Sequence, residues 1–535
     1  MAASEGGGRE EVKQQFTTRE GGYTLMRLSE YSRPTRLTYN SQNHLPVKVS
    51  FISINDNTGC NDKIFFNVGR ELYFYPYKGV RKAADLTKPS DKRTYKGSTL
   101  PTCHDFNQLT ASPKGVSLIV GFSAGQVQLI DPVGRENSKI FNEERQIEKS
   151  KVTTLRWVPG TEHMFLVAHV SGSMYQYNEE LEPVATAPFY QVLKQGEDYA
   201  VLTCKSKVPR NPVQRWVIGE GALYEFAFSN DTKYIATASH DGFMRVFHYD
   251  TMEKYGSMKS YFGGLLCVCW SPDDRYIVVG GEDDFVTVWS FHEKRVVARG
   301  RGHNSWVNVV SFDPYTTDVL PPNMDVYASD DDITHDSNHR DRSFSSYSRT
   351  SVHSGTGDGP PALSYRFGSV GQDTQLCLWD FSEDQILNFQ PNRTRTSTQL
   401  SQSAQCNNVP HGKEASSLHP DGTQTLSNRP TDKSKEKSKK DSISRTPRQQ
   451  YLSKIHETIM CMGSKAIGTT LCPKLDDVFR LEPLITKKIA YDRLTTLIFR
   501  EECIVTGCQE GIINTWARPG KVGMSQHAAA SGTVV

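Results

Sequence analysis

Long hydrophobic runs are absent from this 535-residue sequence. Its apolar stretches have the length of single β-strands, whereas a helix that crosses a bilayer needs about 20 consecutive apolar residues. The first 30 residues contain Glu, Arg and Lys throughout and lack the apolar segment of a secretory signal. We therefore expect a soluble protein that does not insert into a membrane.

The sequence also lacks an excess of charge of either sign. It contains 62 Lys and Arg residues and 60 Asp and Glu residues, which gives a formal net charge of +2. No global field attracts nucleic acid or an anionic membrane, so a partner must recognise a local surface. The 11 cysteines are scattered and odd in number, which disfavours a disulfide framework and indicates an intracellular, reducing environment.

Motifs for metals, nucleotides and cofactors are missing as well. The sequence has neither a Walker loop nor a dinucleotide-binding glycine fingerprint. Cys267 and Cys269 occupy alternate positions of one expected strand but lack a second Cys-x-x-Cys pair, so buried core cysteines are favoured over metal ligands. We expect no metal and no cofactor.

What the chain does contain is a unit that recurs at roughly 40-residue intervals. Each copy has an apolar β-branched run, a tight turn and a second alternating run, which together predict a β-hairpin. A weaker copy begins the series, with one strand in residues 47–54 and a hairpin in residues 63–77. The six clearer copies are residues 116–131, 164–177, 234–248, 276–290, 365–380 and 503–517.

A further strand precedes most of these hairpins and ends in an aromatic residue shortly before Pro, Asp or Ser. The examples are residues 155–159, 226–229, 268–273 and 310–314. With an outer strand added, each copy becomes a four-stranded blade, and seven blades close into a ring without exposed sheet edges. The predicted fold class is all-β, a single seven-bladed β-propeller.

The expected propeller occupies residues 45–517, between an N-terminal arm of residues 1–44 and a flexible tail of residues 518–535. The last copy supplies three strands and then runs into an Arg-Pro-Gly sequence, so its outer strand is missing. We expect a part of the arm within residues 23–40 to fill that place and close the ring.

Two long insertions interrupt the sixth blade, at residues 317–361 and 383–464. Both are rich in Ser, Asp, Asn, Thr, Gln and Lys and have too few apolar residues to offset the entropy of ordering, which predicts disorder. The first separates the first two strands of the blade, and the second separates its third strand from a fourth at residues 484–490. Both should leave from one face of the ring, so the opposite face should remain clear.

The sixth blade also contains Gly302-His303, Ser369, Asp373 and Trp379-Asp380, and this set resembles the full signature of WD repeats. A Ser, a His and an Asp also occur together in hydrolases, but no Gly-x-Ser-x-Gly elbow or other nucleophile signature accompanies them. In WD repeats the Asp accepts from the His, which reaches the Ser, which meets the Trp N–H. We interpret the set as a structural network, with a hydrolase as the alternative.

Aromatic residues mark the entrances to the inner strands of the fifth and sixth blades. Phe262 and Trp306 stand there, in loops between blades on the clear face. Core filling is an alternative for one such residue, but two on one rim favour a contact hot spot. With their neighbours, the predicted partner-binding residues are Phe262, Trp306, Tyr261, Asn304, Tyr224 and Tyr491.

Short signals near the C-terminus allow two interpretations each. The basic run at residues 433–440 fits nuclear import or a solvated segment. Thr533 and Val535 match a C-terminal PDZ ligand, with an inert tail as the alternative. Four apolar residues are spaced like an export signal, although we favour the chain returning to the propeller: Leu475, Val478, Leu481 and Leu484. We expect a cytoplasmic and nuclear protein.

Several strings identify a family resemblance over nearly the whole propeller. They are FNVGRELYFY at 66–75, PTCHDF at 101–106, KSYFGGLLCVCW at 259–270, GEDDFVTVW at 281–289 and FGSVGQDTQLCLWD at 367–380. With them the chain resembles the family of WD-repeat-containing protein 20 and the dystrophia myotonica WD-repeat protein.

This resemblance implies a non-catalytic regulatory subunit. Members of the family bind and activate ubiquitin-specific proteases of the 12 and 46 subgroup, together with a second WD-repeat cofactor, so the nucleophilic Cys would belong to the protease. Docking through Phe262 and Trp306 would favour the active arrangement of that partner. The alternative function is a passive scaffold or substrate-recruiting adaptor that acts through the insertions or the tail.

Overall fold

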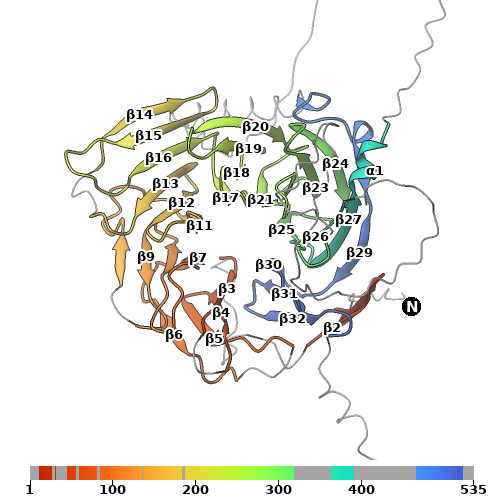
Figure 1. Ribbon diagram of the computed structural model, residues 1–535, viewed down its shortest axis with the longest axis horizontal. Coiled ribbons are helices and arrows are strands. Elements are labelled where there is room, and N and C mark those ends of the chain that lie inside the picture. Colours follow the sequence, from red (N-terminus) through yellow and green to blue (C-terminus); the bar gives the residue numbers. More distant parts are fainter. Residues whose placement is uncertain are drawn as a thin grey trace, which may run out of the picture. The chain divides into compact units, whose positions relative to one another are not determined.

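The structure is a computed structural model, which describes residues 11–26, 31, 45–55, 59–80, 85–135, 138–182, 187–317, 363–390 and 466–521. These residues are mostly β-strand and form seven sheets arranged around a ring (Figure 1). The predicted all-β, seven-bladed β-propeller is therefore confirmed. Most of both predicted insertions, the basic run at 433–440, Thr533 and Val535 lie outside the described residues.

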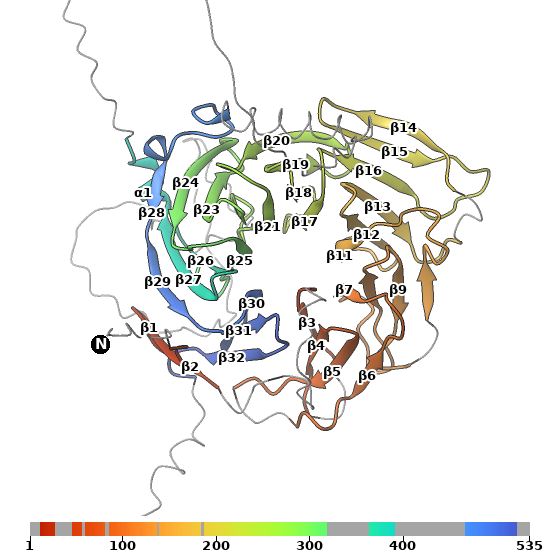
Figure 2. The same cartoon turned by 180° about the vertical axis from the view of Figure 1, so that it is seen from behind.

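Four blades have the expected four antiparallel strands, namely blades 1, 2, 4 and 6. In blades 1, 2 and 4 the first strand lies toward the centre in both views (Figures 1 and 2). Blade 1 contains β3 (Val49–Ser53), β4 (Asp62–Val68), β5 (Glu71–Pro76) and β6 (Asp91–Thr94). Blade 2 contains β7 (Pro101–Phe106), β8 (Leu118–Phe122), β9 (Val127–Ile130) and β10 (Lys139–Phe141). Blade 4 contains β17 (Leu223–Phe228), β18 (Tyr234–Ser239), β19 (Phe243–His248) and β20 (Glu253–Lys259).

Blades 3 and 5 contain strands that the sequence pattern did not reveal. Blade 3 has six strands in the order β11 (Val152–Trp157), β12 (Met164–His169), β13 (Ser173–Asn178), β16 (Gln214–Ile218), β15 (Tyr199–Cys204) and β14 (Tyr190–Gln195). Blade 5 contains β21 (Leu265–Trp270), β22 (Tyr276–Gly281), β23 (Phe285–Ser290) and β24 (Arg295–Arg301), with β28 (Phe479–Leu481) added in parallel to β24.

The last two blades bring together segments that are far apart in the sequence. Blade 6 contains β25 (Val307–Phe312), β26 (Ser364–Gly371), β27 (Gln375–Ser382) and β29 (Pro483–Lys488), so residues from both sides of each insertion pair in one sheet. Blade 7 contains β30 (Leu494–Phe499), β31 (Cys503–Cys508) and β32 (Ile513–Ala517), followed by β2 (Gly21–Leu25) and β1 (Gln15–Thr18) from the N-terminal arm.

The apolar core lies between the blades. Described residues form seven buried clusters, and each cluster contains side chains of two neighbouring blades, including one between blades 7 and 1. Each sheet alternates its apolar side chains between its two faces, so both faces need a neighbour to exclude water. A blade is therefore completed by the blades beside it, and the ring must close to bury all the clusters.

The N-terminal arm occupies the outer edge of blade 7. β2 pairs antiparallel with β32, with Thr24 opposite Ala517 and Leu25 opposite Trp516. Phe16 and Tyr23 are buried and stack with their ring centroids 4.8 Å apart. The pairing with β32 begins at Thr24, within the range 23–40 in which we expected it, although strand β2 itself begins at Gly21. β1 adds a further strand that the sequence analysis did not predict.

A buried ion cluster fixes the turn between β1 and β2 to blade 6. The buried Arg366 guanidinium contacts the Asp380 carboxylate through Nε and Nη2, both at 2.7 Å, and Glu20 Oε1 at 2.6 Å. Partial burial by itself would raise the pKa of Glu20, but hydrogen bonds from Arg366 and Thr18 and the charge of Arg366 lower it to about 2. The arm is thus held by charge as well as by apolar packing.

Three boundaries differ from the sequence prediction. Glu383–Leu387 form helix α1, which Ser382 caps, so the predicted disorder from residue 383 is wrong at this end of the insertion. Thr317 is buried and donates to the Asp313 carbonyl oxygen at 2.6 Å. Arg518, placed in the flexible tail, is buried and pairs with Asp313 at 2.8 Å. At each of these three boundaries a polar contact holds the chain, and the spacing of apolar residues in the sequence does not reveal such a contact.

Deletion of residues 1–26 is expected to lower the melting temperature. The deletion exposes the β32 edge and the Trp516 side chain and removes two buried rings, each worth about 2 kcal/mol or more. Thermal unfolding followed by circular dichroism tests this. Gln15→Ala, which changes an exposed side chain of β1, serves as the control and should leave the melting temperature unchanged. An unchanged melting temperature in the deletion variant would refute closure by the arm.

Glu20→Gln is expected to destabilise the protein at neutral pH but not at low pH. Because the pKa of Glu20 falls from its usual 4.5 to about 2, the ionised group stabilises the fold above pH 4.5, and this contribution disappears as the pH falls toward 2. Melting temperatures of both proteins should therefore converge over that range. A constant difference between them would show that the charge of Glu20 contributes nothing.

Candidate functional site

The four signature residues of blade 6 lie together in one chain of hydrogen bonds. Trp379 Nε1–H donates to Ser369 Oγ at 2.8 Å, and His303 Nε2 lies 2.7 Å from the same oxygen. His303 Nδ1 lies 3.1 Å from both carboxylate oxygens of Asp373. The order is the one expected for a WD-repeat network.

The protonation of this chain opposes a nucleophilic role for Ser369. Burial alone would lower the pKa of His303, but the hydrogen bond to Asp373 raises it to about 9. At neutral pH both ring nitrogens therefore donate, so Ser369 Oγ accepts from His303 and from Trp379. A general base must instead accept the serine proton, and Ser369 is 0% exposed. The geometry fits a structural network.

Other blades keep only parts of the network and replace the rest. In blade 7, Trp516 Nε1–H donates to Thr506 Oγ1 at 2.9 Å. In blade 4, where Phe247 replaces the tryptophan, the buried Arg245 pairs with Asp241 at 2.7 Å and with Asp198 at 2.6 Å. An arginine fork can satisfy the turn aspartate because it supplies several donors in one plane. Each turn is therefore fixed by a different polar contact.

The predicted partner-binding aromatics stand on the loops that connect adjacent blades. Phe262 lies between β20 and β21, Trp306 between β24 and β25, and Tyr491 between β29 and β30. Their exposed fractions are 54%, 43% and 73%, respectively. These loops and the turns between the second and third strands of the blades lie at one end of the strands, and we call this end the rim face. Three large aromatics are thus open to solvent on this face.

The loop that carries Phe262 is held in one conformation. Gly263 has a positive φ of 64°, which favours glycine, and its carbonyl oxygen accepts from Ser260 Oγ at 2.7 Å. Gly264 N–H donates to Glu282 Oε2 at 2.9 Å. A Cβ at Gly242 would lie 2.6 Å from the Gly263 carbonyl oxygen, so the neighbouring turn packs directly against the loop. Phe262 is therefore presented on a rigid support.

The loop that carries Trp306 is fixed by the blade 6 network. Asp373 accepts from the Asn304 N–H at 2.9 Å as well as from His303. On the other side of the turn, the Trp306 carbonyl oxygen accepts from the Gln372 N–H at 2.8 Å. The buried aspartate thus connects the polar network to the position of the exposed indole. Asn304 is itself exposed beside it.

The two remaining predicted residues are partly covered. Tyr224 is the second residue of β17, and its hydroxyl lies 3.2 Å from His240 Nδ1. Tyr261 packs under the Arg299 guanidinium, 5.0 Å from the ring centroid, and its N–H donates to Asp283 at 2.9 Å. Each presents one side to solvent and uses the other to support its loop. Their part in partner binding stays a prediction.

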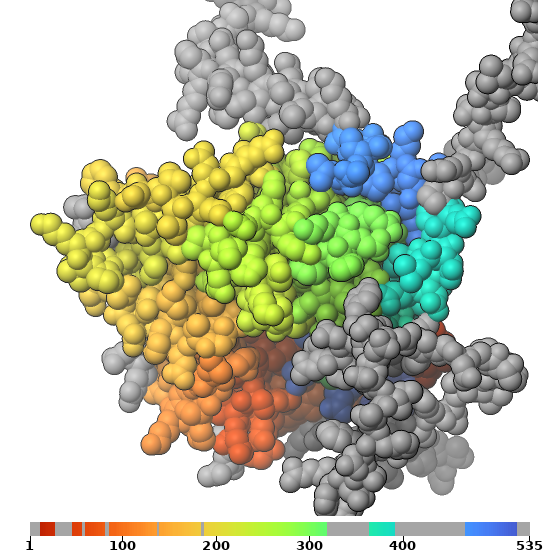
Figure 3. All heavy atoms as spheres, turned by 45° about the horizontal axis from the view of Figure 1, so that its top comes forward, coloured from red at the N-terminus to blue at the C-terminus, as the bar shows by residue number. Residues whose placement is uncertain are grey.

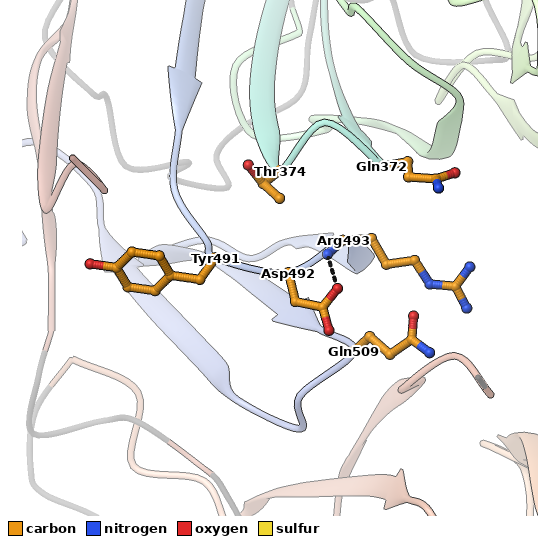
Figure 4. Close-up of a pocket in the computed structure, with 6 residues that line it drawn as sticks. All are labelled: Gln372, Thr374, Tyr491, Asp492, Arg493 and Gln509. Carbon is orange, nitrogen blue, oxygen red and sulfur yellow. Dashed lines mark hydrogen bonds between the residues drawn. The ribbon is translucent and has the colours of Figure 1, made fainter. Parts of the chain in front are cut away.

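A recess of about 300 Å³ opens beside Tyr491 (Figure 4). Sequence reasoning missed its other lining residues because they come from three separate turns. Tyr491 points to one side of the opening and the Arg493 side chain to the other in the close-up. The further lining residues are Gln372, Thr374, Asp492 and Gln509. With an aromatic ring, a guanidinium and two amides, the recess suits a polar side chain of a protein partner.

Acidic groups predominate around the Phe262 loop. Burial raises the pKa of Asp283 to about 6, although the Arg299 charge and two backbone N–H groups oppose this shift. Burial and the nearby Asp373 charge also raise the pKa of Asp284. Glu282 completes a run of three carboxyl groups in this turn. Basic groups on a partner would complement this part of the rim face.

The described residues contain no group of three or more His, Cys, Asp or Glu side chains arranged to hold a metal ion. No described helix is long and apolar enough to cross a membrane.

The chain returns from the second insertion to the propeller, as we favoured, but it does so on a face that we did not expect. Val478 and Leu481, two residues of the export-like pattern, are each only 3% exposed, which fits a chain returning to the propeller. Before them, the Leu471 carbonyl oxygen accepts from the Lys259 N–H at 2.9 Å, and Cys472 Sγ lies 3.5 Å from the Ser260 carbonyl oxygen. This segment therefore reaches the rim face, which we had expected to be clear of both insertions.

The fold and its buried network define the class, a WD-repeat β-propeller. The family model for the WD domain, G-beta repeat, matches residues 214–248 and 253–290. Both matches include the strand in the fourth position of one blade, β16 or β20, and the first three strands of the next blade. The sixth blade carries the full network, but its repeat is interrupted by residues 318–362.

Comparison with known proteins then identifies the family. WD repeat-containing protein 20 of Mus musculus is 52% identical over 98% of this chain and 100% of its own length. The WD repeat-containing protein 20 homolog of Caenorhabditis elegans is 37% identical over 96% of this chain and 84% of its own length. The chain belongs to the WD repeat-containing protein 20 family. A chain from a structure titled "Crystal Structure of Mitotic Checkpoint Complex" aligns over 97% of this chain and 96% of its own length, with a TM-score of 0.46 and 9% identity.

Asp373→Asn is expected to destabilise the fold and to change its pH dependence. Breaking a buried ion pair costs about 3–5 kcal/mol. The pKa of His303 is raised from 6.5 to about 9 in the folded protein. The protonated His303 therefore contributes fully to the free energy of unfolding below pH 6.5, and this contribution is lost as the pH rises toward 9. The melting temperature of the parent protein should fall between pH 6.5 and pH 9, and that of the Asp373→Asn variant should not. Asp284→Asn, one blade away, serves as the control and should show the same fall as the parent protein.

Proposed function

We propose that the protein is a non-catalytic regulatory subunit that binds ubiquitin-specific proteases of the 12 and 46 subgroup through its rim face and raises their turnover. The observation that carries this proposal is the exposure of Phe262 and Trp306 in adjacent, rigidly held loops. Large aromatics exposed in this way are typical anchors of protein interfaces. Membership of the WD repeat-containing protein 20 family supports the same assignment.

The rigidity of the rim face supports activation rather than simple attachment. Phe262 is held by Ser260 and Glu282, and Trp306 by the Asp373 network, so neither loop needs to be ordered upon binding. A rigid surface that fits only the active arrangement of a protease shifts its population toward that arrangement, by a few kcal/mol at most. The catalytic nucleophile belongs to the protease, since Ser369 is sealed within the propeller.

The proposed complex has further components. A second WD-repeat cofactor binds the same protease, and the assembly acts in the cytoplasm and the nucleus without contacting nucleic acid or membrane. The recess beside Tyr491 extends the contact surface toward blade 7. The turn acids near Phe262 favour a basic region of the protease.

Phe262→Ala and Trp306→Ala are each expected to weaken protease binding by about 30-fold, which corresponds to about 2 kcal/mol. Both variants should retain the parent melting temperature, because neither ring belongs to a buried cluster. Isothermal titration with a purified protease of the 12 and 46 subgroup measures the affinity. The same mixture, assayed with a fluorogenic ubiquitin substrate, measures turnover.

Tyr315→Ala provides a matched control, because Tyr315 is an exposed aromatic of blade 6 in the connection after β25, at the opposite end of that strand from Trp306. This variant should bind and activate like the parent protein. Binding without any rise in turnover would contradict activation and support a passive scaffold. Normal binding by both rim variants would refute the docking surface itself.

A further inference from the structure

The outermost strand of blade 3 has no strand beside it among the described residues. β14 pairs with β15 on one side and ends the sheet order on the other. It lies at the outer circumference of blade 3 in both ribbon views, and the hairpin projects as the yellow edge of the space-filling view (Figures 1, 2 and 3). An edge of this kind offers unpaired backbone groups to another strand.

Backbone bonding fixes which groups of β14 face outward. The Lys205 N–H donates to the Phe189 carbonyl oxygen at 2.7 Å, so Phe189 points toward β15. Consecutive residues of an antiparallel pair point alternately toward and away from the partner strand. Tyr190 and Val192 therefore direct their N–H and C=O groups away from the sheet. These four groups form a two-residue template for an incoming strand.

Apolar side chains surround this template. Phe189 is 80% exposed, and Val192, Leu193 and Val208 are each more than half exposed. Leu193 is the extra residue of a β-bulge, which turns its side chain out of the regular pattern. Exposed apolar residues gathered in one place mark interaction sites more often than isolated ones do.

The usual protection of an edge strand is weakened here. A lysine on an edge discourages pairing because its charge must stay in water. Lys194 is the lysine of β14, but its ammonium group lies 2.7 Å from Glu253 on β20 and so leans toward blade 4. The ammonium group of Lys194, which would discourage pairing at the β14 edge, is thus directed away from that edge.

We propose that two copies of the protein associate through β14, antiparallel to each other across a two-fold axis at Gln191. This register places Tyr190 opposite Val192 of the second copy, so their outward N–H and C=O groups bond in pairs. It also places Phe189 opposite Leu193 of the second copy, which covers the most exposed ring with an apolar neighbour.

Charge at the two ends of the strand favours a second copy as the occupant. Lys205 and Lys207 are exposed beside the start of β14, and Glu197 is exposed just after its end. Antiparallel pairing brings the basic end of one copy to the acidic end of the other at both ends of the interface. The surface is therefore self-complementary, as a two-fold contact requires.

The propeller itself shows that outer blade edges accept added strands. β2 pairs with β32, and β28 pairs with β24, although both arrive from distant parts of the sequence. The β14 contact is smaller than a standard protein interface, so we expect dissociation in the micromolar range. It lies on blade 3, apart from Phe262 and Trp306, and does not depend on the proposed rim-face function.

Sedimentation equilibrium of the full chain over increasing concentration tests the proposal. The apparent mass should double in the parent protein. Val192→Pro should abolish the doubling because it removes an outward N–H, whereas the bonds to β15 involve the alternate residues. Leu193→Lys should also give a monomer by placing a charge at the apolar centre. Both variants should keep the parent melting temperature.

Two further comparisons make the test specific. Ile140→Lys introduces the same charge on β10, another outer strand with an exposed apolar residue, and should still dimerise. Lys205→Glu with Lys207→Glu should weaken dimerisation, and adding Glu197→Lys should restore it. A parent protein that stays monomeric at several hundred micromolar would overturn the proposal. So would a dimer that Val192→Pro and Leu193→Lys leave intact.

Discussion

Burial of each blade against the next is the interaction on which the whole molecule depends. All seven buried clusters of the described residues bridge two blades, so no blade contains a complete core of its own. The contact between blades 7 and 1 is formed by residues from the two ends of the propeller sequence. We therefore expect stability to depend on closure of the ring, to which the arm contributes by pairing with β32 and by adding residues to the clusters beside blade 7.

Polar contacts hold the places that apolar packing cannot. Arg366 connects the arm to blade 6, Arg518 connects blade 7 to blade 6, and Arg245 fixes a turn of blade 4. Each of these buried guanidinium groups has a carboxylate partner, as burial of a charge requires. Asp373 accepts from the protonated His303 ring and from the Asn304 N–H, and so fixes the loop beneath Trp306. The exposed aromatics thus stand on supports that the buried charges define.

The sequence predicted those features that repeat. Alternating hairpins located all seven blades, and the signature residues of blade 6 located one network. The positions of Phe262 and Trp306 before inner strands placed them in exposed loops. In each case a local pattern of residue types is enough, because hairpin geometry and side-chain alternation follow from it.

Features made by single contacts could not be predicted in this way. β14 and β15 lie between two strands of blade 3, where they interrupt the repeat of roughly 40 residues, so the search for repeats did not identify them. β28 has only three residues and depends on pairing with β24 for its existence. The recess at Tyr491 joins three turns, whose proximity arises only when blades 6 and 7 pack. Arg518 follows the last strand, and only the folded structure shows that it forms an ion pair with Asp313.

The second insertion begins and ends on different faces of the ring. Helix α1 contacts Arg275, in the turn between β21 and β22, through Glu383 at 3.0 Å, whereas the returning segment meets Ser260 beside the Phe262 loop. The two described ends of this insertion are therefore anchored on opposite sides of the propeller, and the returning end adjoins the loop that presents Phe262.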